Sequence, residues 1–238
     1  MKRFYTSATV TPTADGFGIS LDSKPVRTPG GTLLVVPQLA LAEAIAGEWL
    51  AQLDDINPHS MPLTQLASTT LDRVAINRQP VVEHLLSYAH TDLLCYRAET
   101  PADLALRQEK VWQPLVDWTS VHLGAELVVT FGIVPITQPE ASVEVLRQRV
   151  EGYDAFRLVG LHSLAAALGS LLLGLAMVEG RLTAEEAYVV SELDATYQIE
   201  FWGEDTESTR RWDALRKDIA AAGQFLELCF LGHPPMQT

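Results

Sequence analysis

An acid, an amide and an indole recur at four-residue spacing in the last quarter of the chain. If this stretch is helical, Asp194, Gln198 and Trp202 form one ridge, because residues four apart are neighbours on a helical surface. Gly203 is the expected helix stop, and Glu204 adds an acid at the start of the next helix. We interpret Asp194, Gln198, Trp202 and Glu204 as a partner-binding site; the alternative for Glu204 is a charge that favours a helix start.

Asp194 borders the face of this helix that should be buried. An apolar row runs along the same segment, at Ala187, Val190, Leu193, Tyr197 and Phe201. A carboxylate beside such a row costs stability unless a donor bonds it, either Gln198 or a group on another helix. Its role is therefore structural or functional, and the sequence leaves both open.

The patterns that accompany catalysis, metal binding or nucleotide binding do not occur. The six histidines form no HxxxH or HExxH spacing, and His162 is expected to be a hydrogen-bonded core histidine. There is no GxSxG motif, and Cys95 lacks the context of a cysteine hydrolase. Gly30-Gly31 precedes Thr32 and Leu33 rather than a lysine, which indicates a hairpin turn. We expect no cofactor, no metal and no bound nucleotide.

Composition limits the partners. The chain has 238 residues, 47% of them hydrophobic, which is enough for a substantial core. A formal net charge of -13 repels phosphate backbones, so nucleic acid is not an expected partner. Cys95 and Cys229, each within an apolar stretch, fit buried thiols in a reducing compartment. The N-terminus has no apolar core typical of a secretory signal, and we expect a cytoplasmic protein.

The hydrophobic period changes near Asn57-Pro58. Before it, short alternating runs separated by turn residues predict an antiparallel sheet, with strands at 4–10, 16–21, 25–28 and 33–36, followed by one helix after Pro37. After it the period is mostly helical. The sequence therefore predicts an α+β fold, with a β domain at 1–57 and a larger helical domain at 58–238.

The helical part is marked by prolines and caps. Pro80 and Pro114 are expected to open helices, and Leu127 to Phe131 is a candidate isolated strand. Thr183 and Glu186 have the spacing of a capping box. The last helix repeats apolar residues at alternating spacings of three and four from Trp212 to Cys229, a heptad seam.

A long uncharged segment admits two interpretations. Leu158 to Val178 is long enough to span a bilayer as one helix. It also contains His162, and small residues at Gly169, Ser170 and Gly174 would let neighbouring helices approach closely in a protein core. We favour one long buried helix, without membrane insertion, because a helix apolar on all sides is buried in either lipid or protein.

Several motifs together resemble a known family. They are RFY at Arg3, LDSKPVRTP at Leu21, EWLAQ at Glu48, MPLTQLAS at Met61, TDLLCYRAETP at Thr91, LGSLLLGLA at Leu168 and LDATYQIEFWGEDTE at Leu193. In this order they resemble the alpha-subunit-binding assembly chaperones of F-type ATP synthase, whose mitochondrial members are called ATP synthase assembly factor 2. One departure is Ala195, where the family pattern has a second acidic residue, which weakens any role that needs paired carboxylates.

The resemblance implies a chaperone rather than an enzyme. Such a protein would bind the unassembled alpha subunit of the soluble sector, shield its beta-facing surface and leave on assembly, and this chain would be a bacterial member. Two alternatives remain from the residues themselves. One is an enzyme whose acidic pocket uses Asp194 and Glu204, and the other is a membrane-associated assembly factor anchored by Leu158 to Val178.

Overall fold

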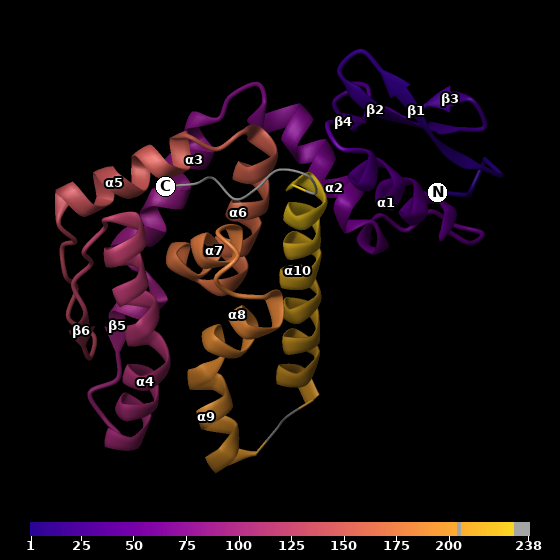
Figure 1. The fold of residues 1–238 in the computed structure, drawn as a ribbon. Helices are drawn as coiled ribbons and strands as arrows, with labels where there is room; N and C mark the ends of the chain where they lie inside the picture. The colour runs from indigo at the N-terminus through magenta and orange to yellow at the C-terminus, as the bar shows by residue number, and fades with distance from the viewer. Residues whose placement is uncertain (204–205, 231–238) are drawn as a thin grey trace. The chain divides into compact units, whose positions relative to one another are not determined.

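The computed structural model describes residues 1–203 and 206–230, and these form two compact units (Figure 1). The first comprises Met1–Arg78, Ala155–Gly160 and the chain from Gln224 on, and the second comprises Gln79–Asp154 and Leu161–Gly223. Helices α6 (Ala155–Leu168) and α10 (Thr206–Phe230) contribute residues to both units. A small antiparallel sheet precedes a larger helical part, so the predicted α+β class is confirmed.

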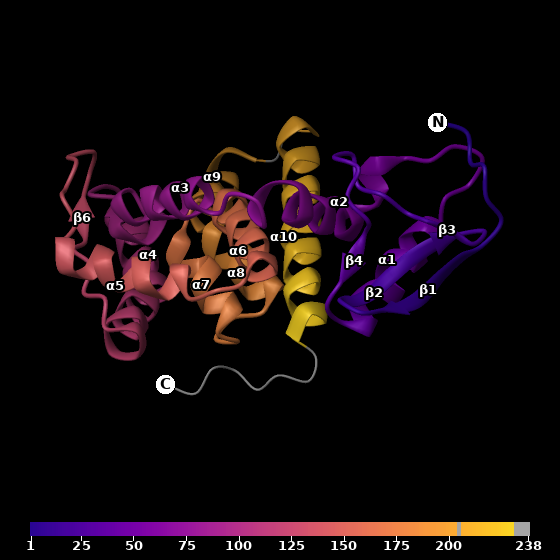
Figure 2. The same ribbon diagram turned by 90° about the horizontal axis from the view of Figure 1, so that it is seen from above.

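The first unit contains a four-stranded sheet with β2 at its centre. Strand β2 (Gly16–Leu21) pairs antiparallel with β1 (Ala8–Thr13), β3 (Lys24–Pro25) and β4 (Val35–Val36). Thr13 pairs with Gly16 across a two-residue turn, which fixes the register of the hairpin. Figure 2 shows β1 at the outer edge of this sheet.

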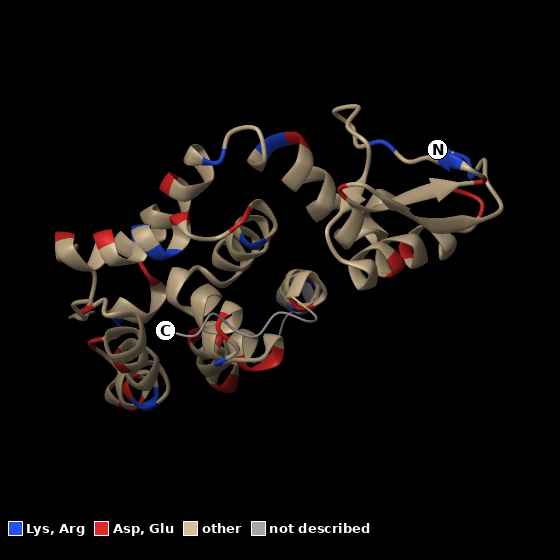
Figure 3. Ribbon diagram, turned by 45° about the horizontal axis from the view of Figure 1, so that its top comes forward, with Lys and Arg blue, Asp and Glu red and all other residues tan. Residues whose placement is uncertain are grey.

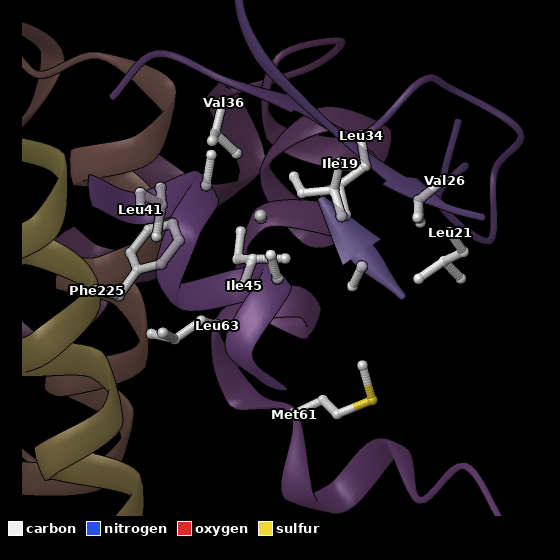
Figure 4. Packing of buried hydrophobic residues seen from close by; sticks show 14 of the residues in the cluster. Ile19, Leu21, Val26, Leu34, Val36, Leu41, Ile45, Met61, Leu63 and Phe225 are labelled. Carbon is white, nitrogen blue, oxygen red and sulfur yellow. The ribbon is translucent and has the colours of Figure 1, made fainter. Parts of the chain in front are cut away.

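One face of the sheet is covered by α1 (Leu39–Leu50). Alternate residues of β2, Ile19 and Leu21, are buried in the same cluster as Leu41 and Ile45 of the helix (Figure 4). Phe225 of α10 is fully buried in the same cluster. The first unit is therefore held by apolar burial that joins residues from both ends of the chain.

The predicted domain boundary lies inside the first unit. After a short 3-10 turn at Pro58–Ser60, helix α2 (Pro62–Thr69) continues into a π-helical turn at Thr70–Val74. Glu48 of α1 accepts hydrogen bonds from the backbone N–H groups of Leu63 and Thr64, at 2.7 and 2.8 Å, and so caps the start of α2. The division into a β domain at 1–57 and a helical domain at 58–238 stays a prediction.

The second unit is helical apart from one short parallel pair of strands. Its elements are α3 (Gln79–His90), a 3-10 turn at Leu93–Cys95, β5 (Tyr96–Arg97), α4 (Ala102–Trp118), a π-helical turn at Thr119–Leu123, β6 (Thr130–Phe131), α5 (Glu140–Glu151), part of α6, α7 (Leu171–Val178), α8 (Ala184–Ser191), α9 (Leu193–Trp202) and part of α10.

Two expectations for this unit are wrong. Pro114 does not open a helix but lies inside α4, which begins at Ala102. An interior proline lacks the N–H donor and crowds the carbonyl four residues earlier, so α4 contains Pro114 at a local cost in stability. The strand expected at Leu127 to Phe131 is reduced to β6, and it is not isolated, since it pairs in parallel with β5.

The prediction of one long helix over Leu158 to Val178 is also wrong. The helical conformation is interrupted at Gly169 and Ser170. Gly169 has a left-handed φ of 65°, and the Ser170 side chain accepts a hydrogen bond from Leu173 N–H to start α7. The expected close approach of neighbouring helices occurs at Gly174 of α7, because a Cβ there would lie 2.8 Å from a methyl of Leu161 on α6. Among the described residues, no helix has both the length and the apolar character required to cross a bilayer.

Asp92 is fully buried at this break and joins the two segments that meet there. Its carboxylate accepts hydrogen bonds from Ser170 Oγ at 2.7 Å, from Leu172 N–H at 3.1 Å and from Leu94 N–H at 3.1 Å. Burial nevertheless raises the pKa of Asp92 from 3.8 to about 6, although these donors favour the charged form. The site keeps its geometry at the cost of a buried charge.

This shift predicts a pH dependence of stability. Since the pKa of Asp92 is higher in the folded than in the unfolded chain, the folded state holds its proton more tightly, and stability falls as pH rises from about 4 to about 6. In wild type this loss should reach at most about 3 kcal/mol, and Asp92→Asn should lack it. Urea unfolding across pH 4 to 7 measures the difference. Asp15→Asn, at an exposed turn, is the control, and an identical pH profile for wild type and Asp92→Asn would contradict the assignment.

Candidate functional site

The segment that carries Asp194 is two helices rather than one. The capping box at Thr183 and Glu186 starts α8 as predicted, with both reciprocal hydrogen bonds present. The backbone then leaves helical geometry at Glu192, with φ -95° and ψ 18°, and α9 begins at Leu193. Val190 therefore belongs to α8, and the apolar row expected from Ala187 to Phe201 is divided between two helices.

Asp194 lies in the first turn of α9 and is half-buried. Its Oδ1 accepts a hydrogen bond of 2.7 Å from Nε2 of Gln108, on α4. Burial raises the pKa of Asp194, and the hydrogen bond from Gln108 partly offsets this. The donor that a carboxylate at this place requires is thus on another helix, one of the two possibilities that the sequence left open.

The orientation of the Gln108 amide is set by a second contact. Gln108 is only 1% exposed, and its Oε1 accepts a hydrogen bond of 2.7 Å from Ala98 N–H, which follows β5. Because the oxygen is committed to that donor, the NH₂ group must face Asp194. The amide therefore joins α9 to α4 and to the strand before it.

Further polar contacts continue this arrangement along α4, and we call the set the α4 ladder. It consists of Trp112 Nε1–H to Val190 O at 3.0 Å, Gln108 to Asp194, Tyr197 OH to the Asp103 carboxylate at 2.8 Å, and Arg107 to the Glu200 carboxylate at 2.8 Å. The Arg107 guanidinium also lies 5.1 Å from the centre of the Tyr197 ring. The ladder fixes α8 and α9 against one side of α4.

The other proposed site residues are placed differently. Gln198 is exposed, and among the described residues it is not a partner of Asp194. Trp202 is the last residue of α9, while the orientation of its side chain and the whole of Glu204 lie outside the described structure. A partner-binding role for Asp194, Gln198, Trp202 and Glu204 stays a prediction.

Sequence reasoning missed the α4 residues that position Asp194. Part of their signal was present, since Asp103 and Arg107, and likewise Gln108 and Trp112, are polar or amphipathic residues four apart and so are neighbours on a helical surface. It was overlooked because the helix was expected to start at Pro114. A polar row on one helix indicates a partner, but not which helix supplies it.

Within the described ranges, no group of three or more His, Cys, Asp or Glu side chains could hold a metal ion. The Nε2 of His162 lies 2.7 Å from Nδ1 of His84, so the predicted hydrogen bond is confirmed, whereas the ring is half-buried and not in the core as expected. Burial, followed by the neighbouring His84, lowers the pKa of His162. Both cysteines are buried, as expected.

The ladder predicts a specific cost for removing its central amide. Gln108→Met keeps a side chain of similar length. It leaves the Ala98 N–H without its acceptor and the Asp194 carboxylate without its donor. The free energy of unfolding should fall by about 2 to 4 kcal/mol. Gln113→Met is the matched control on the same helix, because the hydrogen bond that Gln113 donates to Asp117 is exposed, and it should change stability by less than about 0.5 kcal/mol. Equal effects in urea titrations would contradict the role of Gln108.

Comparison with known proteins gives a consistent picture. The family described as ATP12 chaperone protein matches residues 2–120. The mitochondrial atp12 protein of Schizosaccharomyces pombe is 25% identical over 218 residues, which cover 86% of this chain and 75% of that protein. The crystal structure of Atp12 from Paracoccus denitrificans has a TM-score of 0.91 and 38% identity, covering 96% of this chain and 98% of that chain.

A second bacterial structure, from Agrobacterium tumefaciens, also has a TM-score of 0.91 and 38% identity, and covers 95% of this chain and 85% of that chain. The likeness thus extends over both compact units, well past the segment that the family description matches. The chain belongs to the ATP12 chaperone family.

Proposed function

We propose that this protein is an assembly chaperone that binds the unassembled alpha subunit of F-type ATP synthase and shields its beta-facing surface. The observation that carries the proposal is the structural match to Atp12 of Paracoccus denitrificans over 96% of the chain. The motifs from Arg3 to Glu207 support the choice of the alpha subunit through their family resemblance. We infer that it acts in the cytoplasm, without catalysis.

The need for such a protein is physical. A subunit made before its neighbours exposes apolar interface that promotes aggregation, and a holding protein covers that surface until the correct neighbour arrives. The alpha subunit is released by competition from the beta subunit, because we expect this protein to bind no nucleotide that could drive release. The distribution of 30 acidic against 17 basic residues over the fold (Figure 3) makes like-charged, acidic surfaces poor partners.

Helix α9 supplies the features from which we propose the docking face. Asp194 uses one carboxylate oxygen for Gln108, and its Oδ2 has no hydrogen-bond partner among the described residues. Phe201, seven residues later on the same side of the helix, is 62% exposed, and its ring lies 4.8 Å from that of Tyr197. Exposed aromatic rings are enriched at protein interfaces, and the unbonded oxygen of Asp194 on the same side of the helix can accept a hydrogen bond from a partner.

The acidic-pocket enzyme gains no support from this arrangement. In the described part of the chain, the hydrogen-bond partner of Asp194 is an amide, and neither a second carboxylate nor a nucleophile bonds to it. A general acid or base needs a reacting group within hydrogen-bond reach.

The test separates charge from structure at Asp194. Asp194→Asn keeps an oxygen acceptor for Gln108 but removes the charge, and Asp194→Lys reverses it. With isolated alpha subunit, wild type should suppress aggregation in light scattering. Both variants should capture alpha at least about tenfold more weakly, the lysine more severely, while the asparagine variant keeps a near-normal melting temperature.

Glu140→Lys, an exposed charge reversal on α5, is the control and should capture alpha normally. Melting and capture are measured on the same preparations. A purely structural Asp194 would instead lower stability by about 3 to 5 kcal/mol on conversion to lysine, with normal capture wherever the variant is folded. Aggregation of alpha that is unchanged by wild-type protein would refute the proposed function itself.

A further inference from the structure

A groove in the first unit is lined by residues of β1 and of one side of α1. Its volume is about 530 Å³, within the range of ligand pockets. Its walls are largely apolar, with Val10 and Pro12 from β1, and Leu39, Glu43, Gly47 and Leu50 from α1. Leu39 and Leu50 are 44% and 47% exposed, so apolar surface remains uncovered at both ends of the helix.

The strand that borders the groove has an open edge. Among the described strands β1 pairs only with β2, and Asp22 N–H donates to Ser7 O just before β1 begins. Since backbone groups alternate in direction along an antiparallel strand, the N–H and C=O groups of Ala8 and Val10 face away from β2. These groups can bond an added strand.

No close contact and no unusual backbone angle in the fold requires a glycine at position 47. It lies in the interior of α1, where glycine is less favourable than alanine. A Cβ added there would meet nothing within 4 Å, so neither crowding nor an unusual φ requires a glycine. Its missing side chain keeps the groove open beside Glu43.

The charge in the groove selects the kind of occupant. Glu43 is the only charged residue lining it, is exposed, and among the described residues has no ion pair. A carboxylate in an otherwise apolar groove favours a lysine or arginine flanked by apolar residues.

We propose that this groove binds an extended apolar segment of a partner protein, which adds to β1 as a further strand and places a lysine or arginine against Glu43. Main-chain hydrogen bonds to Ala8 and Val10 would supply binding, and the groove would accept alternate side chains. The inference goes beyond the proposed function, because it concerns the other unit and does not depend on the alpha subunit as partner.

The experiment uses the full chain and a synthetic probe. The probe is a fluorescein-labelled, end-blocked peptide of about eight residues, alternating valine and threonine, with one central lysine. We expect saturable binding, and we expect amide exchange measured by NMR to slow at Ala8 and Val10, while Thr9 and Thr11, already paired with β2, change little. Absence of saturable binding up to about 1 mM peptide would overturn the proposal, as would binding that leaves Ala8 and Val10 unprotected.

Variants of Gly47 and Glu43 test whether these two residues determine what the groove binds. Gly47→Leu adds a side chain whose Cβ meets nothing within 4 Å, so it should keep or raise the melting temperature while its branches occupy the groove and weaken peptide binding more than about tenfold. Glu43→Lys should weaken binding of the lysine peptide at least about threefold and favour a matched glutamate peptide. Glu126→Lys, an exposed control in the second unit, should alter neither affinity. Unchanged affinity in Gly47→Leu would place the peptide elsewhere and refute the groove.

Discussion

The amide of Gln108 is the contact on which the arrangement of the second unit depends most. It lies almost fully buried between a backbone N–H at Ala98 and the carboxylate of Asp194, and both of its polar ends are used. A buried polar network of this kind stabilises one arrangement of helices over others, because any shift leaves a buried group without its partner. The orientation of α9, and with it the exposed oxygen of Asp194, follows from α4.

Both units use the same solution where one segment begins against another. Glu48 receives the first N–H groups of α2 in the first unit, and Asp92 receives those of α7 in the second. In each case burial raises the pKa of the carboxyl group, so a long-range cap is obtained at an electrostatic cost. Apolar burial supplies most of the stability of these units, and the carboxylates determine where helices start.

Several local signals were read correctly from the sequence, and long-range partners were not. The strand at Gly16–Leu21 and the capping box at Thr183 depend on neighbouring residues, and both occur as predicted. The break at Gly169 was hidden because Leu158 to Val178 has no charged residue and is mostly apolar, so periodicity could not separate two helices. The donor to Asp194 could not be found, since pairing between α4 and α9 is a property of the fold rather than of either segment.

We propose that α9, held by α4, presents the face that meets the client. The test is hydrogen exchange of the whole chain, free and in complex with isolated alpha subunit. We expect added protection across residues 193–202, with α4 protected to the same degree in both states because its ladder is already formed. Added protection confined to other elements, with exchange in α9 unchanged on complex formation, would contradict it.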